Sequence, residues 1–152
     1  MRRIATAATA LIIGLGSALV AATPAAAATP SLRFHSMQYD SPGKDTRSNA
    51  SLNAEYVVLV NTGSKAVNLK GYTVRDAAGK KYTFGSVSLA GKGGKIYLHT
   101  GKGGNTKKHR YWGSGNYIWN NTGDKATLKN AKGKTVDTCS YGNKKGRTKI
   151  AC

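Results

Sequence analysis

Acidic residues are scarce in this chain, which has six Asp and Glu against 24 Lys and Arg. Glycoside hydrolases need two carboxyl groups across a cleft, and calcium sites need several carboxylates, so both kinds of site have few candidates. Asp40, Asp45 and Glu55 fall close enough in sequence to meet around one loop, but basic residues lie among them. We therefore expect no calcium site, and we interpret Glu55 as a structural hydrogen-bond partner.

Histidine and cysteine are also few, with three histidines dispersed along the chain and two cysteines. Zinc sites need clustered His and Cys ligands. No serine lies in a G-x-S-x-G element of the hydrolase kind, and no glycine-rich loop opens a helix that could hold a phosphate. We therefore expect no catalytic residue, no metal and no cofactor. A nuclease activity that depends on His109 is the enzymatic alternative.

Long apolar runs are absent outside the N-terminus. Residues 1–3 carry two arginines, residues 4–22 are apolar and small, and residues 25–28 are alanines. This order is typical of a secretory signal peptide, so we expect cleavage after Ala28 and a secreted mature protein. A membrane anchor is the alternative, but Gly14 and Gly16 interrupt the run and Pro24 follows it. With no second run of this length, we expect no transmembrane segment in the mature chain.

Helical periodicity is missing too, and no amphipathic element suited to a membrane surface is visible. Short β-branched and aromatic runs instead alternate with turns rich in Gly, Asn, Asp and Lys. Seven or more strands at this spacing predict an all-β fold, an antiparallel β-sandwich. Residues 54–61 (AEYVVLVN) are apolar on both faces of the expected strand, so we place this strand at the centre of a sheet.

The same pattern predicts the other elements. Residues 32–39 predict a first strand, and residues 40–53 predict a long polar loop. Residues 67–74 predict a strand whose spacing changes at Gly71, which indicates a glycine bulge. Residues 76–79 predict a hairpin turn. Further strands are expected at residues 81–84, 87–89, 95–99, 111–112, 117–119, 126–128 and 135–139.

Four sequence blocks within this pattern resemble one known family. Blocks similar in order and spacing to those of lamin tail domains occupy residues 55–63 (EYVVLVNTG), 67–76 (VNLKGYTVRD), 119–128 (WNNTGDKATL) and 136–141 (VDTCSY). The resemblance covers residues 31–142 and implies an immunoglobulin-like β-sandwich without enzymatic activity. It also implies that the blocks are structural. Asn61 and Gly63 would form a turn, and Asn120, Asn121 and Asp124 would bond backbone groups at a strand entrance.

The two cysteines, Cys139 and Cys152, both lie near the C-terminus. In an oxidising exterior an even pair predicts a disulfide, which would stabilise the fold by about 3 kcal/mol by closing the loop between them. We therefore divide the chain into a signal peptide (1–28), a lamin-tail-like domain (29–142) and a basic C-terminal tail (143–152) closed by the disulfide.

Positive charge is the most abundant feature of the mature chain. Without Arg2 and Arg3, the chain keeps 22 basic and six acidic residues, a net charge of about +16. A field of this sign attracts polyanions, so we expect a nucleic acid or an anionic cell-wall polymer as partner. The alternative is a structural or protein-interaction domain, with a protein partner and incidental charge.

Two dense basic clusters are the predicted polyanion-binding residues. They are Lys102, Lys107, Lys108 and Arg110 in the first cluster, and Lys144, Lys145, Arg147 and Lys149 in the second. Aromatic residues follow the first cluster, and basic side chains beside rings suit nucleic acid. We nevertheless expect Trp119 in the core, and Tyr111 and Trp112 half-buried. Other lysines, such as Lys81 and Lys129, are interpreted as solvated faces of turns.

Overall fold

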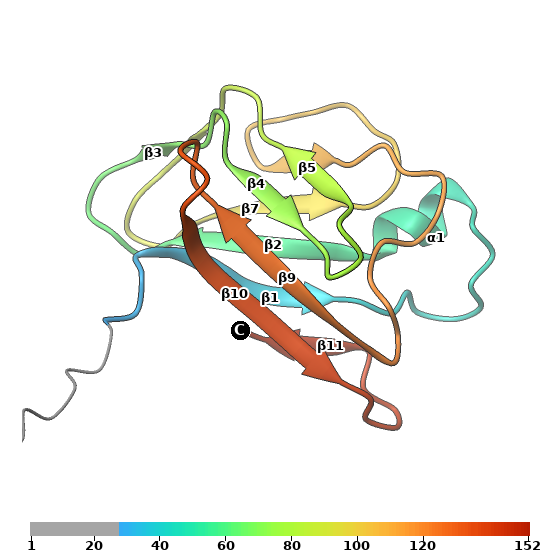
Figure 1. Cartoon of the computed structure of the whole chain (residues 1–152). Helices are drawn as coiled ribbons and strands as arrows, with labels where there is room; N and C mark the ends of the chain where they lie inside the picture. The colour runs from blue at the N-terminus through green and yellow to red at the C-terminus, as the bar shows by residue number, and fades with distance from the viewer. Residues whose placement is uncertain (1–27) are drawn as a thin grey trace, which may run out of the picture.

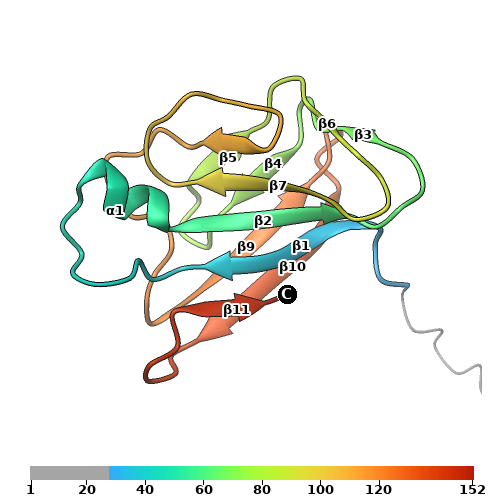
Figure 2. The same ribbon diagram turned by 180° about the vertical axis from the view of Figure 1, so that it is seen from behind.

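The structure is a computed structural model that describes residues 28–152. The predicted signal peptide therefore lies outside the described residues, apart from its last residue. The expected β-sandwich is confirmed, because two sheets pack face to face around one apolar core (Figures 1 and 2).

The larger sheet has five strands in the order β11-β1-β2-β7-β8. Its strands are β1 (Leu32–Gln38), β2 (Tyr56–Asn61), β7 (Gly94–His99), β8 (His109–Tyr111) and β11 (Lys149–Ala151). β2 lies at its centre, as its apolar sequence predicts. β7 and β8 run parallel to each other, which the antiparallel prediction did not include, whereas the other strand pairs of this sheet are antiparallel.

The second sheet has four antiparallel strands in the order β10-β9-β4-β5. They are β4 (Thr73–Arg75), β5 (Lys81–Thr83), β9 (Gly123–Lys129) and β10 (Thr135–Gly142). A separate short pair joins β3 (Val67–Asn68) to β6 (Ser88–Leu89). The predicted turn at 76–79 links β4 to β5, with Asp76 N–H donating to the Lys80 carbonyl and Gly79 at φ +97°.

Alternate side chains of the two sheets meet between them and form the core. From β2, Val57 and Leu59 point inward, and from β9, Ala126 and Leu128 do the same. Trp119 is 2% exposed and belongs to this core, as expected. Residues on the opposite side of each strand therefore face outward, which decides what surface the protein offers.

The predicted loop at 40–53 is wrong in part, because it contains the short helix α1 (Asn49–Ala54). Ser48 caps the helix by accepting a hydrogen bond from Ser51 N–H at 3.2 Å, and Leu52 is its buried residue. Six residues are too few to show a helical repeat in the sequence, so the capping serine was the available signal.

The predicted bulge at Gly71 is also wrong, because Gly71 lies between two strands and not within one. Gly71 has φ +79° and separates β3 from β4, which pair with different strands. Its N–H donates to the Phe84 carbonyl at 2.9 Å. A left-handed glycine here lets the chain leave one strand pair and enter the second sheet, so the change of spacing marks a strand break.

The strand predicted at 117–119 is wrong, since these residues have no strand partner. They form a buried connection in which Ile118 and Trp119 are core residues. The Ile118 N–H donates to the Glu55 carboxylate at 2.8 Å, so a side chain takes the place of a strand partner.

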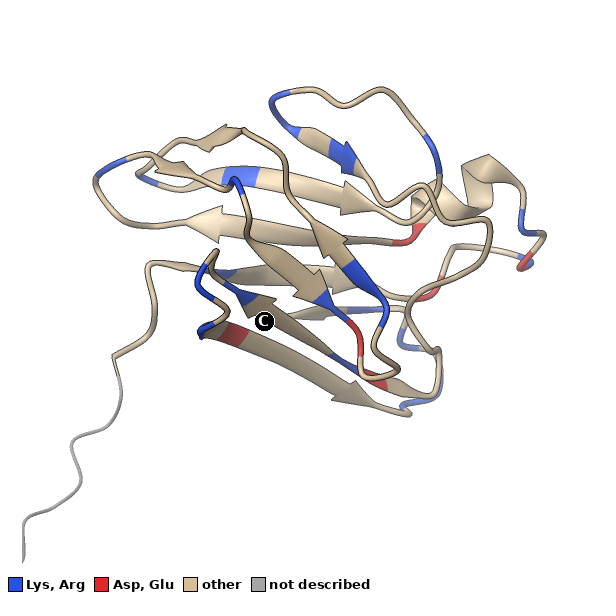
Figure 3. Ribbon diagram, turned by 45° about the horizontal axis from the view of Figure 1, so that its top comes forward, with Lys and Arg blue, Asp and Glu red and all other residues tan. Residues whose placement is uncertain are grey.

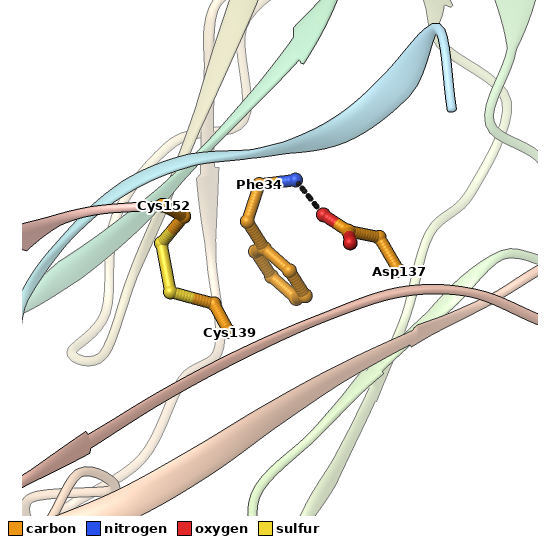
Figure 4. Close-up of a disulfide and its surroundings, with 4 residues drawn as sticks. All are labelled: Phe34, Asp137, Cys139 and Cys152. Atoms are coloured by element: carbon orange, nitrogen blue, oxygen red, sulfur yellow. Dashed lines mark hydrogen bonds between the residues drawn. A yellow bond between two sulfur atoms is a disulfide. The ribbon is translucent and has the colours of Figure 1, made fainter. Parts of the chain in front are cut away.

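The C-terminal segment is ordered as an edge strand, which the predicted tail did not include. β11 pairs with β1 through Ser36–Ala151, Met37–Ile150 and Gln38–Lys149. The predicted disulfide is present between Cys139 on β10 and Cys152, with an S–S distance of 2.04 Å (Figure 4). It connects the end of β11 to the second sheet.

Candidate functional site

Four of the six carboxylates accept hydrogen bonds from backbone N–H groups of the fold. Glu55, Asp76 and Asp124 are buried, and each accepts hydrogen bonds from backbone N–H groups. Asp137 is half-buried and accepts from the Phe34 N–H at 2.8 Å. Asp40 and Asp45 both accept from the Asn121 amide, at 3.1 and 3.4 Å. Three of the six carboxylates are therefore buried, and the other three are too few to offset the exposed basic residues.

The basic residues, by contrast, lie outside. Four of the described ones are half-buried, namely Arg33, Arg110, Lys129 and Arg147, and the others are exposed. Figure 3 shows them spread over the loops, the turns and both sheets, with no single face holding them all. The exposed side chains are thus mostly cationic, because the basic residues lie outside and half of the six carboxylates are buried.

The first predicted cluster lies around the loop from β7 to β8. Lys102, Lys107 and Lys108 are exposed on this loop. The Lys102 backbone is tied to α1, because its carbonyl accepts from the amides of Asn49 and Asn53 at 3.0 and 2.9 Å. The backbone at Lys102 is therefore held against α1.

Arg110 lies differently from the lysines of the first cluster. Its guanidinium donates to the Thr106 carbonyl within the same loop. Alternation along β8 places it on the opposite face from His109 and Tyr111, towards Tyr82 of the second sheet. We therefore assign Arg110 to the support of the loop.

The second predicted cluster lies in the turn from β10 to β11 and at the first residue of β11. Lys144, Lys145 and Lys149 are exposed. Arg147 is half-buried and donates to the Gly142 carbonyl at 2.8 Å and to the Tyr39 hydroxyl at 3.2 Å. The lysines are thus available to a ligand, whereas Arg147 holds the turn.

The two predicted clusters do not form one surface. β8 and β11 are the opposite edges of the five-stranded sheet, with β1, β2 and β7 between them. At the usual spacing of strands, these edges are roughly 19 Å apart. A ligand that contacts both clusters must therefore cross the sheet.

The structure gathers a third basic group that sequence reasoning missed. Arg75 on β4, Lys81 on β5 and Lys129 at the end of β9 line an open pocket of about 290 Å³ with Thr73. β4 pairs with both β5 and β9, which brings these three residues together. The sequence carried no signal for the group, since Lys81 and Lys129 are distant in the chain and the pairing was unknown.

The histidines and carboxylates show no catalytic arrangement among residues 28–152. His99 and His109 contact each other at 3.0 Å, and no carboxylate bonds either ring. Within the same residues, no group of three or more His, Cys, Asp or Glu could hold a metal ion. The described helix is also too short to cross a membrane.

Comparison with known proteins identifies the family. The family model of the Lamin Tail Domain matches residues 25–143. This chain belongs to the Lamin Tail Domain family. A search of curated proteins found no match. The family is one of structural immunoglobulin-like domains, and the sandwich of this lamin tail domain agrees with it.

Glu55 opens one family block of the lamin tail domain and binds the backbone just before another block begins. Its Oε1 accepts from the Thr100 hydroxyl at 2.5 Å and from the Ile118 N–H at 2.8 Å, while Oε2 has no partner of normal geometry. Burial raises the pKa of Glu55 to about 7, although the hydrogen bonds from Thr100 and from the backbone of Ile118 and Trp119 oppose the rise. The structural interpretation of Glu55 is thereby supported.

Other residues of the same two blocks also serve the architecture. Asn61 accepts from Gly63 N–H at 3.0 Å and donates to the carbonyls of Lys65 and Leu89, so it fastens the turn after β2. Asp124 accepts from the backbone N–H groups of Ala77, Asn120 and Lys125. Both side chains therefore hold backbone segments in place within the fold.

Proposed function

We propose that this lamin tail domain is a secreted, non-enzymatic protein that binds an extracellular polyanion through its cationic surface. The polyanion is a nucleic acid or an anionic cell-wall polymer. The single observation that carries the proposal is the separation of charge: backbone N–H groups bind most carboxylates within the fold, while most basic side chains are exposed.

The distribution of the basic residues favours a polymer over a small anion. Lysines lie at both edges of the five-stranded sheet, and a further group lines the pocket on the second sheet. Groups that point in different directions can contact successive charges of a long chain, and each contact releases counterions. Several weak contacts of this kind add up when one polymer carries them all.

Charge reversal at the two edges tests the proposal. One variant changes Lys102, Lys107 and Lys108 to Glu, and a second changes Lys144, Lys145 and Lys149 to Glu. Arg110 and Arg147 are left unchanged because they support their loops. We expect both variants to elute from heparin and DNA columns at clearly lower salt than the wild type. Unchanged elution of both variants would contradict the proposal.

A protein partner is the competing explanation, and the same variants address it. Binding to a protein through sheet edges or uncharged loops would survive reversal of these lysines. The control replaces Thr138 and Ser140, outward residues of β10, by alanine without any change of charge. We expect this control to elute as the wild type does.

Secretion is tested by the N-terminus of the protein recovered outside the producing cell. We expect the mature chain to begin at Thr29, with the pair Cys139–Cys152 oxidised. Recovery of the full-length chain from the cell interior would contradict this part of the proposal.

A further inference from the structure

The outer face of the five-stranded sheet carries aromatic, histidine and basic side chains. The register gives two rows across the strands: Lys149, Gln38, Tyr56, His99 and Tyr111, and next to it Ala151, Ser36, Val58, Tyr97 and His109. Arg33, Val60 and Lys95 extend the face beyond the second row. Among these described residues there is no carboxylate.

Five of these side chains form a ring cluster, which we define as Tyr56, Tyr97, His99, His109 and Tyr111. Ring centroids are 5.2 Å apart for Tyr97 and His109, 5.1 Å for His99 and Tyr111, and 5.5 Å for Tyr56 and His99. All five residues are half-buried, and the ring of Tyr111 lies against Gly103 of the loop from β7 to β8. The core has its own rings, and none of these five belongs to it.

Hydrogen bonds hold the two histidines in place. His99 Nδ1 lies 2.8 Å from the Asn53 carbonyl, an acceptor, so this nitrogen carries the proton. In neutral His99 the other nitrogen, Nε2, then accepts from His109 Nδ1 at 3.0 Å. The remaining ring nitrogen, His109 Nε2, takes no part in these two hydrogen bonds. Fixed rings lose little conformational freedom when a ligand packs on them, which favours binding.

Positive charge borders the ring cluster. His35 lies at the irregularity between Phe34 and Ser36, and its pKa is lowered by burial and then by the charges of Lys95, Arg33 and Lys149. The register places Arg33 and Lys95 beside the second row and Lys149 at the β11 end of the first row. Lys107 and Lys108, in the loop that leads into β8, line one pocket with Lys95, whereas Lys149 lies at the β11 edge of the sheet. Phosphates would find positive charge at both of these places.

We propose that this face binds single-stranded nucleic acid, with bases on the ring cluster and phosphates on the lysines and arginine around it. The inference rests on the proposed function and deepens it. Any of the four bases can stack on an aromatic ring, and the faces of the bases are accessible only in an unpaired strand. An anionic wall polymer has phosphates but no planar base, so it would leave the ring cluster unused.

The test compares three probes with the same folded protein by fluorescence anisotropy. The probes are a short single-stranded DNA, an abasic phosphodiester chain of the same length, and a duplex of the same sequence. We expect the single strand to bind about ten-fold more tightly than either of the others, because stacking of one base is worth roughly 1–3 kcal/mol. Equal affinity for the single strand and the abasic chain would overturn the inference while leaving polyanion binding intact.

Two variants locate the effect. Tyr97→Leu keeps apolar volume on the sheet and removes a ring, and Tyr111→Leu does the same at the edge strand. We expect each to lose most of the preference for the single strand while keeping its affinity for the abasic chain. The matched control, Lys132→Gln, removes one exposed charge on the turn between β9 and β10 and should weaken all three probes alike. A preference that persists in both ring variants would overturn the inference, and failure of every probe to bind would overturn the proposed function as well.

Discussion

Asp137 on β10 accepts a hydrogen bond of 2.8 Å from the backbone N–H of Phe34 on β1, so a carboxylate of one sheet binds a backbone group of the other (Figure 4). β11 pairs with β1 only at residues 36–38, and no strand on that side reaches Phe34. Two residues further along β10, Cys139 forms the disulfide to Cys152. One short stretch of β10 therefore holds the first and last strands of the described chain.

Asp137→Ala tests the first of these contacts. The change leaves the Phe34 N–H without its acceptor between the sheets, and we expect a loss of about 1–3 kcal/mol in the free energy of unfolding. Asp137→Asn keeps an acceptor oxygen and should lose less. Urea unfolding measures both, and an alanine variant as stable as the wild type would show that the contact contributes nothing.

The disulfide is tested by changing Cys139 and Cys152 together to alanine. We expect a loss of about 3 kcal/mol, because the unfolded chain regains the freedom of the closed loop. A reductant should destabilise the wild type by a similar amount and leave the double variant unaffected. If neither treatment alters the urea midpoint, the bond is not a source of stability.

Glu55 gives stability a dependence on pH. Its pKa is raised from 4.5 to about 7 in the folded protein, so the folded state holds the proton more tightly than the unfolded state. This contribution is present at acidic pH and is lost as the pH rises through about 7, a change on the order of 3 kcal/mol. In Glu55→Gln the position no longer titrates.

The measurement is the free energy of unfolding of both proteins from about pH 5 to about pH 8. The lowered pKa of His99 also makes stability depend on pH, in the direction opposite to Glu55. This effect is the same in both proteins, so the difference between their curves reports Glu55 alone. We expect the wild type to lose stability relative to Glu55→Gln as the pH rises. Parallel curves would mean that Glu55 titrates at its ordinary pKa.

The pocket on the second sheet should contribute to binding independently of the five-stranded sheet. Arg75→Gln and Lys81→Gln together remove two of its charges. We expect the slope of log affinity against log salt for duplex DNA to become shallower by about two, roughly one per lost phosphate contact. A slope equal to that of the wild type would exclude this pocket from the interface.

The architecture could be predicted from local patterns, whereas the surface could not. The apolar run of β2 indicated a central strand, and the paired cysteines indicated their disulfide, because both depend on residues near in sequence or few in number. The helix α1 was not predicted because only one of its six residues, Leu52, is buried. The parallel pairing of β7 with β8 could not be predicted, because the periodicity of one strand does not indicate the direction of its neighbour.

The candidate site shows the same limit. The two dense basic runs were visible in the sequence, yet Arg110 and Arg147 hold their loops through backbone carbonyls, which a charge count cannot reveal. The group of Arg75, Lys81 and Lys129 exists only through strand pairing. The ring cluster likewise needs the register of β7 and β8, which places Tyr97 beside His109 and His99 beside Tyr111.

The central claim is that the exposed positive charge of this lamin tail domain binds a polyanion, and the salt dependence of affinity tests it most directly. The mature, disulfide-bonded protein is titrated with duplex DNA over a series of salt concentrations. We expect a straight line of log affinity against log salt with a negative slope of at least about four, since each neutralised phosphate contributes roughly 0.9. A flat line, or no binding at the lowest salt, would contradict the account.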